Sequence, residues 1–122
     1  MAKDLRISYL LDFYGEMLTQ TQREVTESYY YDDLSLAEIS EVRGITRQGV
    51  RDAIKRSEKE LQEMEDKLGL VKRFKKTEDA LTRICDCALL IKDKNEGKNS
   101  EIDELVADII GTAAALTETD SK

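Results

Sequence analysis

The chain has 122 residues and carries 19 Lys and Arg against 26 Asp and Glu, which gives a formal net charge of −7. This length suits one ordinary domain, whose modest core needs no metal or disulfide. Proline is absent, and 40% of the residues are hydrophobic while 37% are charged. Because long helices would meet few breakers, we expect a soluble, all-α protein.

Several functional classes are excluded by what the composition lacks. The chain has no histidine, which is the commonest general base and metal ligand. Cys85 and Cys87 are two residues apart, where helical side chains point to nearly opposite sides, so we expect reduced thiols and a cytoplasmic protein. No glycine-rich phosphate loop and no apolar run of about 18 residues occurs. We therefore expect no catalytic residues, no metal site, no cofactor and no membrane span.

The charges are distributed unevenly along the chain. Residues 1–34 carry 3 basic and 7 acidic groups (−4), residues 35–76 carry 11 and 8 (+3), and residues 77–122 carry 5 and 11 (−6). Affinity for DNA comes largely from Lys and Arg that neutralise phosphates. Only the middle third of the chain could therefore face a polyanion.

The first predicted helix ends near residue 18. Its apolar residues recur at spacings of three and four, as one buried helix face requires. They are Leu5, Tyr9, Leu10, Phe13, Tyr14, Met17 and Leu18. Thr19 lies three residues before Gln22, a capping-box pattern that predicts a second helix running to about Tyr31.

A short helix, a tight turn and a long helix follow. Ser35 can cap the short helix, which spans Leu36 to about Val42. Gly44 accepts the left-handed backbone that a sharp helix exit needs, and Thr46 caps the fourth helix of about 22 residues. The apolar stripe of this helix consists of Val50, Ile54, Ser57, Leu61, Met64 and Leu68. We expect the stripe to pack against the C-terminal helices of the chain or to form a two-chain coil.

The C-terminal third is predicted to hold two more helices. Residues 69–76 are interpreted as a basic linker or bend, and residues 95–99 as a loop. The fifth helix would place on one side Leu81, Ile84, Cys85, Ala88 and Ile91. Ser100 would cap a sixth helix that carries Ile102, Leu105, Val106, Ile109, Ile110, Ala113 and Leu116, and residues 117–122 would fray.

These elements suggest a helix-turn-helix domain at residues 1–70 and a helical extension at residues 71–122. The extension would be part of the same compact unit or a dimer interface.

The segment from Leu36 to Lys55 has the parts of a helix-turn-helix, in which the outer face of the second helix enters the major groove of DNA. Its inner contacts would come from Ile39, Ile45, Val50 and Ala53 or Ile54. Arginine can hold guanine and glutamine can hold adenine bidentately, while lysine can bind phosphates. The predicted DNA-binding residues are Thr46, Arg47, Gln48, Arg51, Lys55 and Lys59. The alternative is that this charged outer face is simply solvated.

Four segments resemble the YlxM family of helix-turn-helix proteins, over about residues 1–76. They read LTQTQREV at 18–25, YY at 29–30, LSLAEI at 34–39 and GITRQGVRDAIKR at 44–56. The helix-turn-helix of that family is in turn similar to the fourth conserved region of bacterial sigma factors, which reads a promoter element. The chain departs from the sigma pattern at Ser40, Arg43 and Gly49.

The resemblance implies a sigma-region-4-like helix-turn-helix in a bacterial cytoplasmic protein. Together with the long fourth helix and the two additional C-terminal helices that the spacing predicts, this gives the expected all-α architecture. It places sigma-like contacts to bases and phosphates on Thr46, Arg47, Gln48, Arg51 and Lys55. In many Gram-positive species the family is encoded beside the gene for the signal recognition particle GTPase, which implies a part in that pathway.

Three hypotheses remain open at this point. The chain is a DNA-binding regulator, expected to be a homodimer. Alternatively, it is an accessory protein that binds the signal recognition particle GTPase or its RNA and modulates its activity. In the third hypothesis, residues 77–122 build a dimer interface that the helix-turn-helix only supports.

Overall fold

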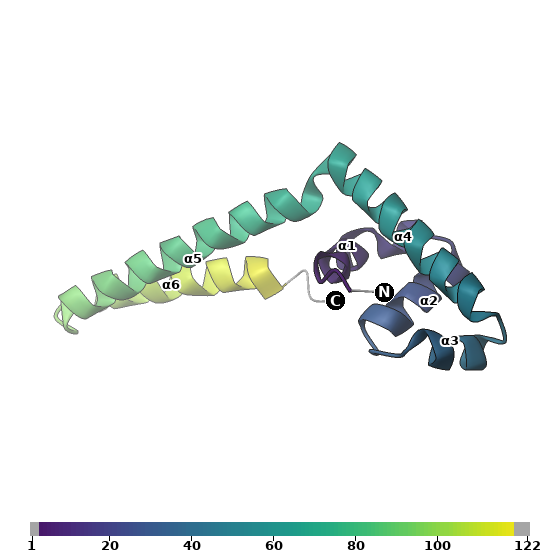
Figure 1. Cartoon of the computed structure of the whole chain (residues 1–122). Helices are drawn as coiled ribbons and strands as arrows, with labels where there is room; N and C mark the ends of the chain where they lie inside the picture. The colour runs from purple at the N-terminus through teal and green to yellow at the C-terminus, as the bar shows by residue number, and fades with distance from the viewer. Residues whose placement is uncertain (1–2, 119–122) are drawn as a thin grey trace. The chain divides into compact units, whose positions relative to one another are not determined.

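The computed structural model describes residues 3–118 of the chain (Figure 1). This part is helical and has no strand, which confirms the predicted all-α fold. Its elements are α1 (Arg6–Tyr14), the 3-10 helix η1 (Gly15–Met17), α2 (Gln20–Tyr30), α3 (Leu36–Arg43), α4 (Arg47–Leu68), α5 (Leu70–Asn95) and α6 (Ser100–Glu118). The chain divides into two compact units, which we call the first unit (residues 1–71) and the hairpin unit (residues 72–122).

The long helix α4 organises the first unit, where it contacts α1, α2 and α3 (Figure 1). The fully buried Leu61 packs in a cluster with Ile7, Leu10, Leu11, Tyr14 and Leu18. Val50 and Ile54 pack in a second cluster with Val25, Tyr29 and Ile39. From Val50 to Leu61 the apolar stripe of α4 is therefore covered by the N-terminal helices of the same chain. The expected packing against the C-terminal helices, or in a two-chain coil, is wrong for this part of the stripe.

The buried face of α1 also differs from the predicted one. Three residues that the sequence assigned to the core are exposed, namely Leu5 (75%), Tyr9 (61%) and Met17 (65%). Leu10 and Tyr14 are buried as predicted, and the helix also buries Ile7 and Leu11, which were not predicted, at the spacings of a single helical face. Because apolar residues occur on nearly all sides of this segment, several choices of buried face satisfy the same spacing rule.

Side-chain caps determine where α2, α3 and α4 begin. Thr19 caps α2 and Ser35 caps α3, each in a reciprocal capping box with the residue three positions later. The Thr46 hydroxyl caps α4 and accepts a hydrogen bond of 2.9 Å from the Gly49 N–H. At the end of α3, Gly44 has a left-handed φ of 68°. These caps and the length of α4, 22 residues, confirm the sequence-based predictions.

A single residue, Gly69, separates α4 from α5. It has a left-handed φ of 62°, and α5 begins at the next residue, Leu70. The basic stretch that follows Gly69 is therefore helical, and the predicted linker at 69–76 is wrong.

A set of hydrogen bonds, which we call the tyrosine clasp, caps the start of α5. The Tyr14 hydroxyl donates to Glu65 Oε1 at 2.6 Å and accepts from the Leu70 N–H at 3.0 Å. The same carboxylate oxygen accepts from the Val71 N–H at 3.1 Å. The first N–H groups of a helix lack partners within it, so here α1 and α4 supply the cap. Burial, and next the bond to Glu65, raise the pKa of Tyr14.

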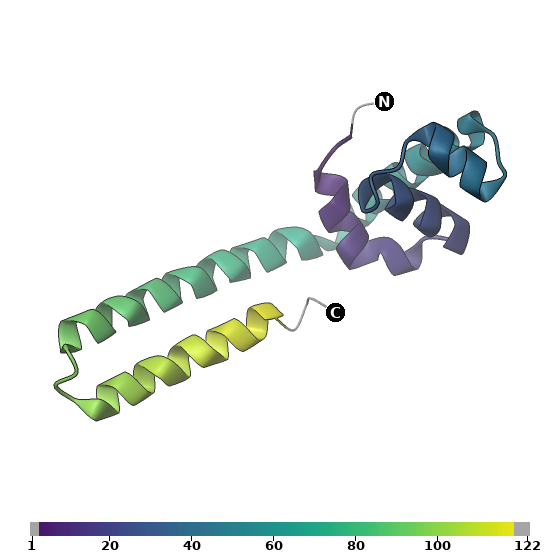
Figure 2. The ribbon, with the colours of Figure 1, turned by 90° about the horizontal axis from the view of Figure 1, so that it is seen from below.

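The hairpin unit consists of the rest of α5 and α6, which run side by side in opposite directions (Figures 1 and 2). At the turn, the Asn95 side chain donates to Asn99 O and to Asp103, and Asn99 Oδ1 accepts from the Glu101 N–H. Asn99 thus caps α6, and the predicted cap, Ser100, is the first residue of the helix. The buried hydrophobic residues of the described part of this unit are Ala88, Val106 and Ala113.

Within residues 3–118, none of the helices combines the length and the apolar character that a membrane span requires. The predicted fraying concerns residues 117–122, which lie mostly outside the described residues, since α6 is described as far as Glu118.

Candidate nucleic-acid interface

The corner between α3 and α4 is fixed by backbone and side-chain hydrogen bonds. The Gly44 N–H bonds to Ser40 O at 2.9 Å, which closes the last turn of α3. The Ser40 hydroxyl donates to Ile45 O on the far side of the turn. Because Thr46 then caps α4, the direction of the second helix is set by three local contacts. The two helices form a helix-turn-helix, as the sequence predicts.

The inner side of α4 is held by buried apolar residues. Ile39 of α3 packs with Val50 and Ile54, which are both 0% exposed, and Ala53 packs against this cluster from a half-buried position. Ile45, which the sequence also placed inside, is 39% exposed. The prediction for Ile45 is wrong because Ile45 lies in the turn, between the left-handed Gly44 and the cap Thr46, and is not part of either helix.

All six predicted DNA-binding residues lie between Thr46, the cap of α4, and Lys59, just past its middle, and all six are exposed. Thr46 is engaged in the cap, and the other five side chains follow it along the helix. Measured from Val50 at 100° per residue, Gln48 and Lys59 fall opposite the buried cluster, at about 160° and 180°, with Lys55 at about 140° and Arg51 on the flank at about 100°. The predicted residues therefore share one exposed side of α4, which we call the cationic face.

Two of these side chains already have acidic neighbours. The Gln48 amide donates to Asp52 Oδ1 at 2.8 Å, and Lys55 Nζ lies 4.0 Å from Glu58 Oε1. Glu58 is in turn the acceptor of the Tyr30 hydroxyl. Asp52 thus places a negative charge within the cationic face.

Arg43 has a structural contact that sequence reasoning missed. Its guanidinium forms an ion pair with Glu24 on α2, 19 positions earlier in the chain. A hydrogen bond from Gln20, and next the one from Arg43, lower the pKa of Glu24. Arg43 is therefore an anchor between α3 and α2, and no local pattern in the sequence could have revealed this contact.

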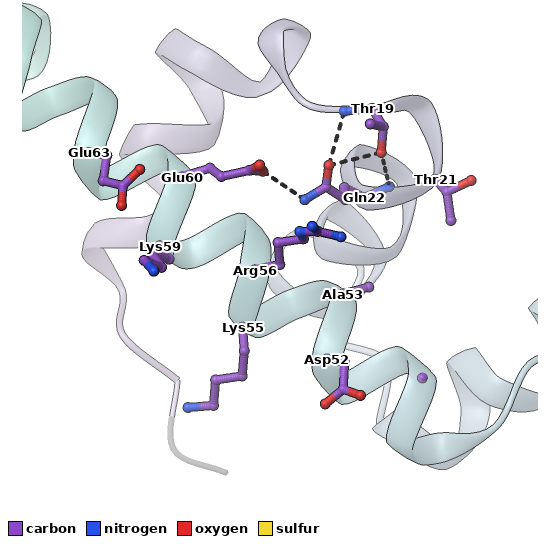
Figure 3. A pocket seen from close by; sticks show the side chains of 11 residues that line it. Thr19, Thr21, Gln22, Asp52, Ala53, Lys55, Arg56, Lys59, Glu60 and Glu63 are labelled. Carbon is purple, nitrogen blue, oxygen red and sulfur yellow. Dashed lines mark hydrogen bonds between the residues drawn. The ribbon is translucent and has the colours of Figure 1, made fainter.

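A groove beside the cationic face contains another residue that was not predicted. Arg56 points from α4 toward the first turn of α2, whereas Lys55 points away from α2 (Figure 3). The Gln22 amide donates to Glu60 Oε2 at 2.7 Å and joins the capping box of α2 to α4 (Figure 3). Along α4 the groove is lined by Lys55, Arg56 and Lys59, with Asp52 before them and Glu60 and Glu63 after them. The position of Arg56 follows from the packing of α2 on α4, which the sequence did not indicate.

Gly49 has a local explanation in the cap of α4. A Cβ atom built on Gly49 would lie 3.1 Å from the Thr46 hydroxyl oxygen, closer than ordinary van der Waals contact. Glycine at this position therefore leaves room for the Thr46 hydroxyl, which accepts the hydrogen bond from the Gly49 N–H.

Metal and disulfide chemistry find no support in the described residues. Within residues 3–118, no group of three or more His, Cys, Asp or Glu side chains could hold a metal ion. Both thiols are free, that of Cys85 half-buried and that of Cys87 exposed.

Comparison with known proteins places this geometry in a family context. Residues 1–103 match the model of a protein family described as "Putative helix-turn-helix protein, YlxM / p13 like". A UPF0122 protein of Clostridium acetobutylicum is 42% identical over 111 residues, which cover 89% of this chain and 96% of the relative. One from Thermoanaerobacter sp. is 43% identical over 105 residues, 86% of this chain and 88% of the relative. One from Caldanaerobacter subterraneus is 49% identical over 83 residues, 68% and 71% of the two chains.

Proposed function

Since the chain belongs to the YlxM / p13-like family of helix-turn-helix proteins, we propose that it is a cytoplasmic DNA-binding regulator that acts as a homodimer. The family is one of helix-turn-helix proteins and not of enzymes. The observation that carries the proposal is the exposed cationic face of α4, opposite fully buried Val50 and Ile54. A rigidly seated helix with such a face is what entry into the major groove requires.

The proposed roles follow from the donor geometry of each side chain. Arg51 would contact a guanine edge, and Gln48 would contact an adenine once it releases Asp52. Arg47, Lys55 and Lys59 would neutralise phosphates, and Thr46 would add a hydroxyl at the start of the helix. Because the segments on either side of residues 35–76 are acidic, DNA contact is confined to this face.

Fluorescence anisotropy with DNA selected from a random pool tests the proposal. Lys55→Ala is expected to reduce the slope of log affinity against log salt by about one phosphate contact, and Arg51→Ala to cost about 1–3 kcal/mol at one base position. Lys67→Ala is the matched control, because Lys67 is an exposed cation near the other end of α4. Absence of salt-dependent binding by the wild type, or an equal effect of Lys67→Ala, would contradict the proposal.

A second candidate function rests on two exposed apolar residues at the corner. Val42 is 76% exposed and Ile45 is 39% exposed, and exposed apolar surface near a charged face is typical of protein contacts. The chain would then bind the signal recognition particle GTPase or its RNA and modulate its activity, with α4 as the charged part of the contact.

Co-purification with the particle and a GTPase assay separate this candidate from DNA binding. Val42→Ser, which removes the exposed apolar side chain without adding a charge, is expected to weaken a protein contact and to leave DNA affinity unchanged. An unchanged GTPase rate together with no co-purification would exclude the accessory function.

A further inference from the structure

The hairpin unit leaves most of its large apolar side chains exposed. Its buried hydrophobic residues in the described part are two alanines and one valine. The exposed fractions of the larger residues include 62% for Leu105, 55% for Leu116, 49% for Ile91, 48% for Ile84 and 39% for Ile109. Two helices packed on each other bury only one stripe each, so any further apolar stripe stays in water.

That further stripe has the spacing of a coiled coil on both helices. On α5 it consists of Ala80, Ile84, Cys87 and Ile91, and on α6 of Leu105, Ile109, Thr112 and Leu116. Each set steps by four, three and four residues, as the a and d positions of a heptad do. We call these two sets the outer seams, to distinguish them from the positions of Ala88, Val106 and Ala113 between the helices.

The two outer seams lie on the same face of the hairpin. Ile109 of α6 lines one apolar groove together with Ala80, Ile84, Cys87 and Ile91 of α5. The seams therefore join into one apolar face, with five Leu and Ile side chains that each expose about a third to two-thirds of their surface. A patch of roughly several hundred Å² is at or above what a monomeric protein usually leaves exposed.

Opposite charges border this face on its two sides. At 100° per residue, the positions just beyond the α5 seam, on the side away from α6, are Lys76, Arg83 and Lys94. The corresponding positions beyond the α6 seam are Glu101 and Asp108. One edge of the face is thus basic and the other is acidic.

We propose that this face binds a second copy of the chain, so that two hairpins form a four-helix bundle in which α5 of each copy lies on α6 of the other. A two-fold axis along the helices produces this arrangement and sets the basic edge of each copy against the acidic edge of its partner. The other two-fold stacking, with α5 on α5, sets like charges together. The face is therefore complementary to itself in one arrangement.

The arrangement also fixes which residues meet across the interface. Counting outward from the turn at 96–99, Lys94 is level with Glu101 of the partner copy, and Arg83 lies about one turn from its Asp108. Because the axis runs along the helices, both chains enter the bundle at the same end. This inference does not depend on whether α4 binds DNA.

Analytical ultracentrifugation of the full chain provides the first test. Ile84→Asp is expected to weaken self-association by at least about 30-fold, as for a central interface residue. Leu89→Asp is the matched control, because Leu89 is on the same helix and is also 48% exposed, but it points away from the outer seam. A monomeric wild type at about 100 μM, or an equal effect of both variants, would overturn the proposal; if a different protein covers the face, the wild type is monomeric.

Charge exchange provides a second test that leaves the apolar seams intact. The variant Arg83→Glu with Lys94→Glu, and the variant Glu101→Lys with Asp108→Lys, should each self-associate more weakly than the wild type. When the two are mixed, every edge pairs opposite charges again, so a heterodimer should form in preference to either homodimer. If native mass spectrometry finds the species in statistical proportions, the α5-on-α6 arrangement is wrong.

Discussion

The two units of this chain use amphipathic helices in different ways. In the first unit, α4 is covered by three other helices, and Val50, Ile54 and Leu61 are each 0% exposed. Within the hairpin unit α5 and α6 pack on each other, and among its described residues those buried most fully are Ala88, Val106 and Ala113. In both units the apolar residues of the helices recur at spacings of three and four. What differs is the number of neighbouring helices, and this number decides whether an apolar stripe becomes a core or a surface.

The positions of the tyrosines allow the unfolding of the two units to be measured separately. All five tyrosines lie between residues 9 and 31, and the chain has no tryptophan. Tyrosine fluorescence therefore reports unfolding of the first unit alone, whereas far-ultraviolet circular dichroism reports the helices of both units. Each prediction below can be assigned to one unit by comparing the two signals.

The largest expected effect comes from truncating the core of the first unit. Ile54→Ala leaves a cavity beside Val50 and should lower the free energy of unfolding by about 2–5 kcal/mol. Urea denaturation followed by tyrosine fluorescence measures this loss. Leu89→Ala on the exposed side of α5 should shift the unfolding of the hairpin unit, followed by circular dichroism, by less than about 0.5 kcal/mol. Similar shifts for both variants would mean that the two units do not differ in this way.

A glycine-to-alanine substitution should lower the stability of the first unit at one position and raise the stability of the hairpin unit at another. Gly44 has a φ of 68°, so Gly44→Ala should destabilise the first unit by about 1–2 kcal/mol. Gly111 is in the interior of α6, where a Cβ would meet nothing within 4 Å. Gly111→Ala should therefore stabilise the hairpin by about 0.5–1 kcal/mol, seen in circular dichroism and not in tyrosine fluorescence. A destabilising Gly111→Ala would show that this part of α6 is closely packed against a partner.

The smallest expected effect is a dependence on acid that is confined to the first unit. The carboxyl pKa values that are clearly lowered within residues 3–118 belong to Asp4, Glu24, Asp33 and Glu38. A pKa below its unfolded value adds stability above the unfolded pKa, and this stability is lost as pH falls through the folded pKa. For Glu24, whose ordinary value is 4.5, the loss begins near that pH and continues below it.

Urea titrations at several pH values check this expectation through the variant Glu24→Gln. The variant should be less stable than the wild type at pH 7, and the difference should shrink as pH falls below about 4.5. A difference that stays constant down to the acid transition would show that the Glu24 carboxylate is not the source.

The helix-turn-helix could be predicted because its determinants are local. Ser35, Gly44 and Thr46 each act through a bond or a φ angle within a few residues, and the inner contacts of α4 repeat at a single period. The six candidate DNA-binding residues could be placed on one exposed face for the same reason. Their role in binding is a prediction that the experiments above test.

The remaining features depend on packing between distant segments. The side of α1 that faces the core is decided by Leu61, more than 40 positions away, so the exposure of Tyr9 and Met17 could not be foreseen. The ion pair of Arg43 with Glu24 and the direction of Arg56 depend on the position of α2. The charge of the basic stretch after Gly69 suggests a linker, although Lys and Arg are good helix formers and the stretch is helical.

The tyrosine clasp has a consequence for the order in which the chain acquires its structure. Tyr14 and Glu65 can bond the first N–H groups of α5 only after α1 and α4 have docked. During synthesis the first 71 residues are complete before the hairpin has emerged, so they can offer a finished starting point on which α5 nucleates, and nucleation is the costly step of helix formation. The dependence runs in one direction, because the first unit can fold without the hairpin unit but provides the cap for α5. A chain stalled after Val71 would already contain the groups that cap the first N–H groups of α5.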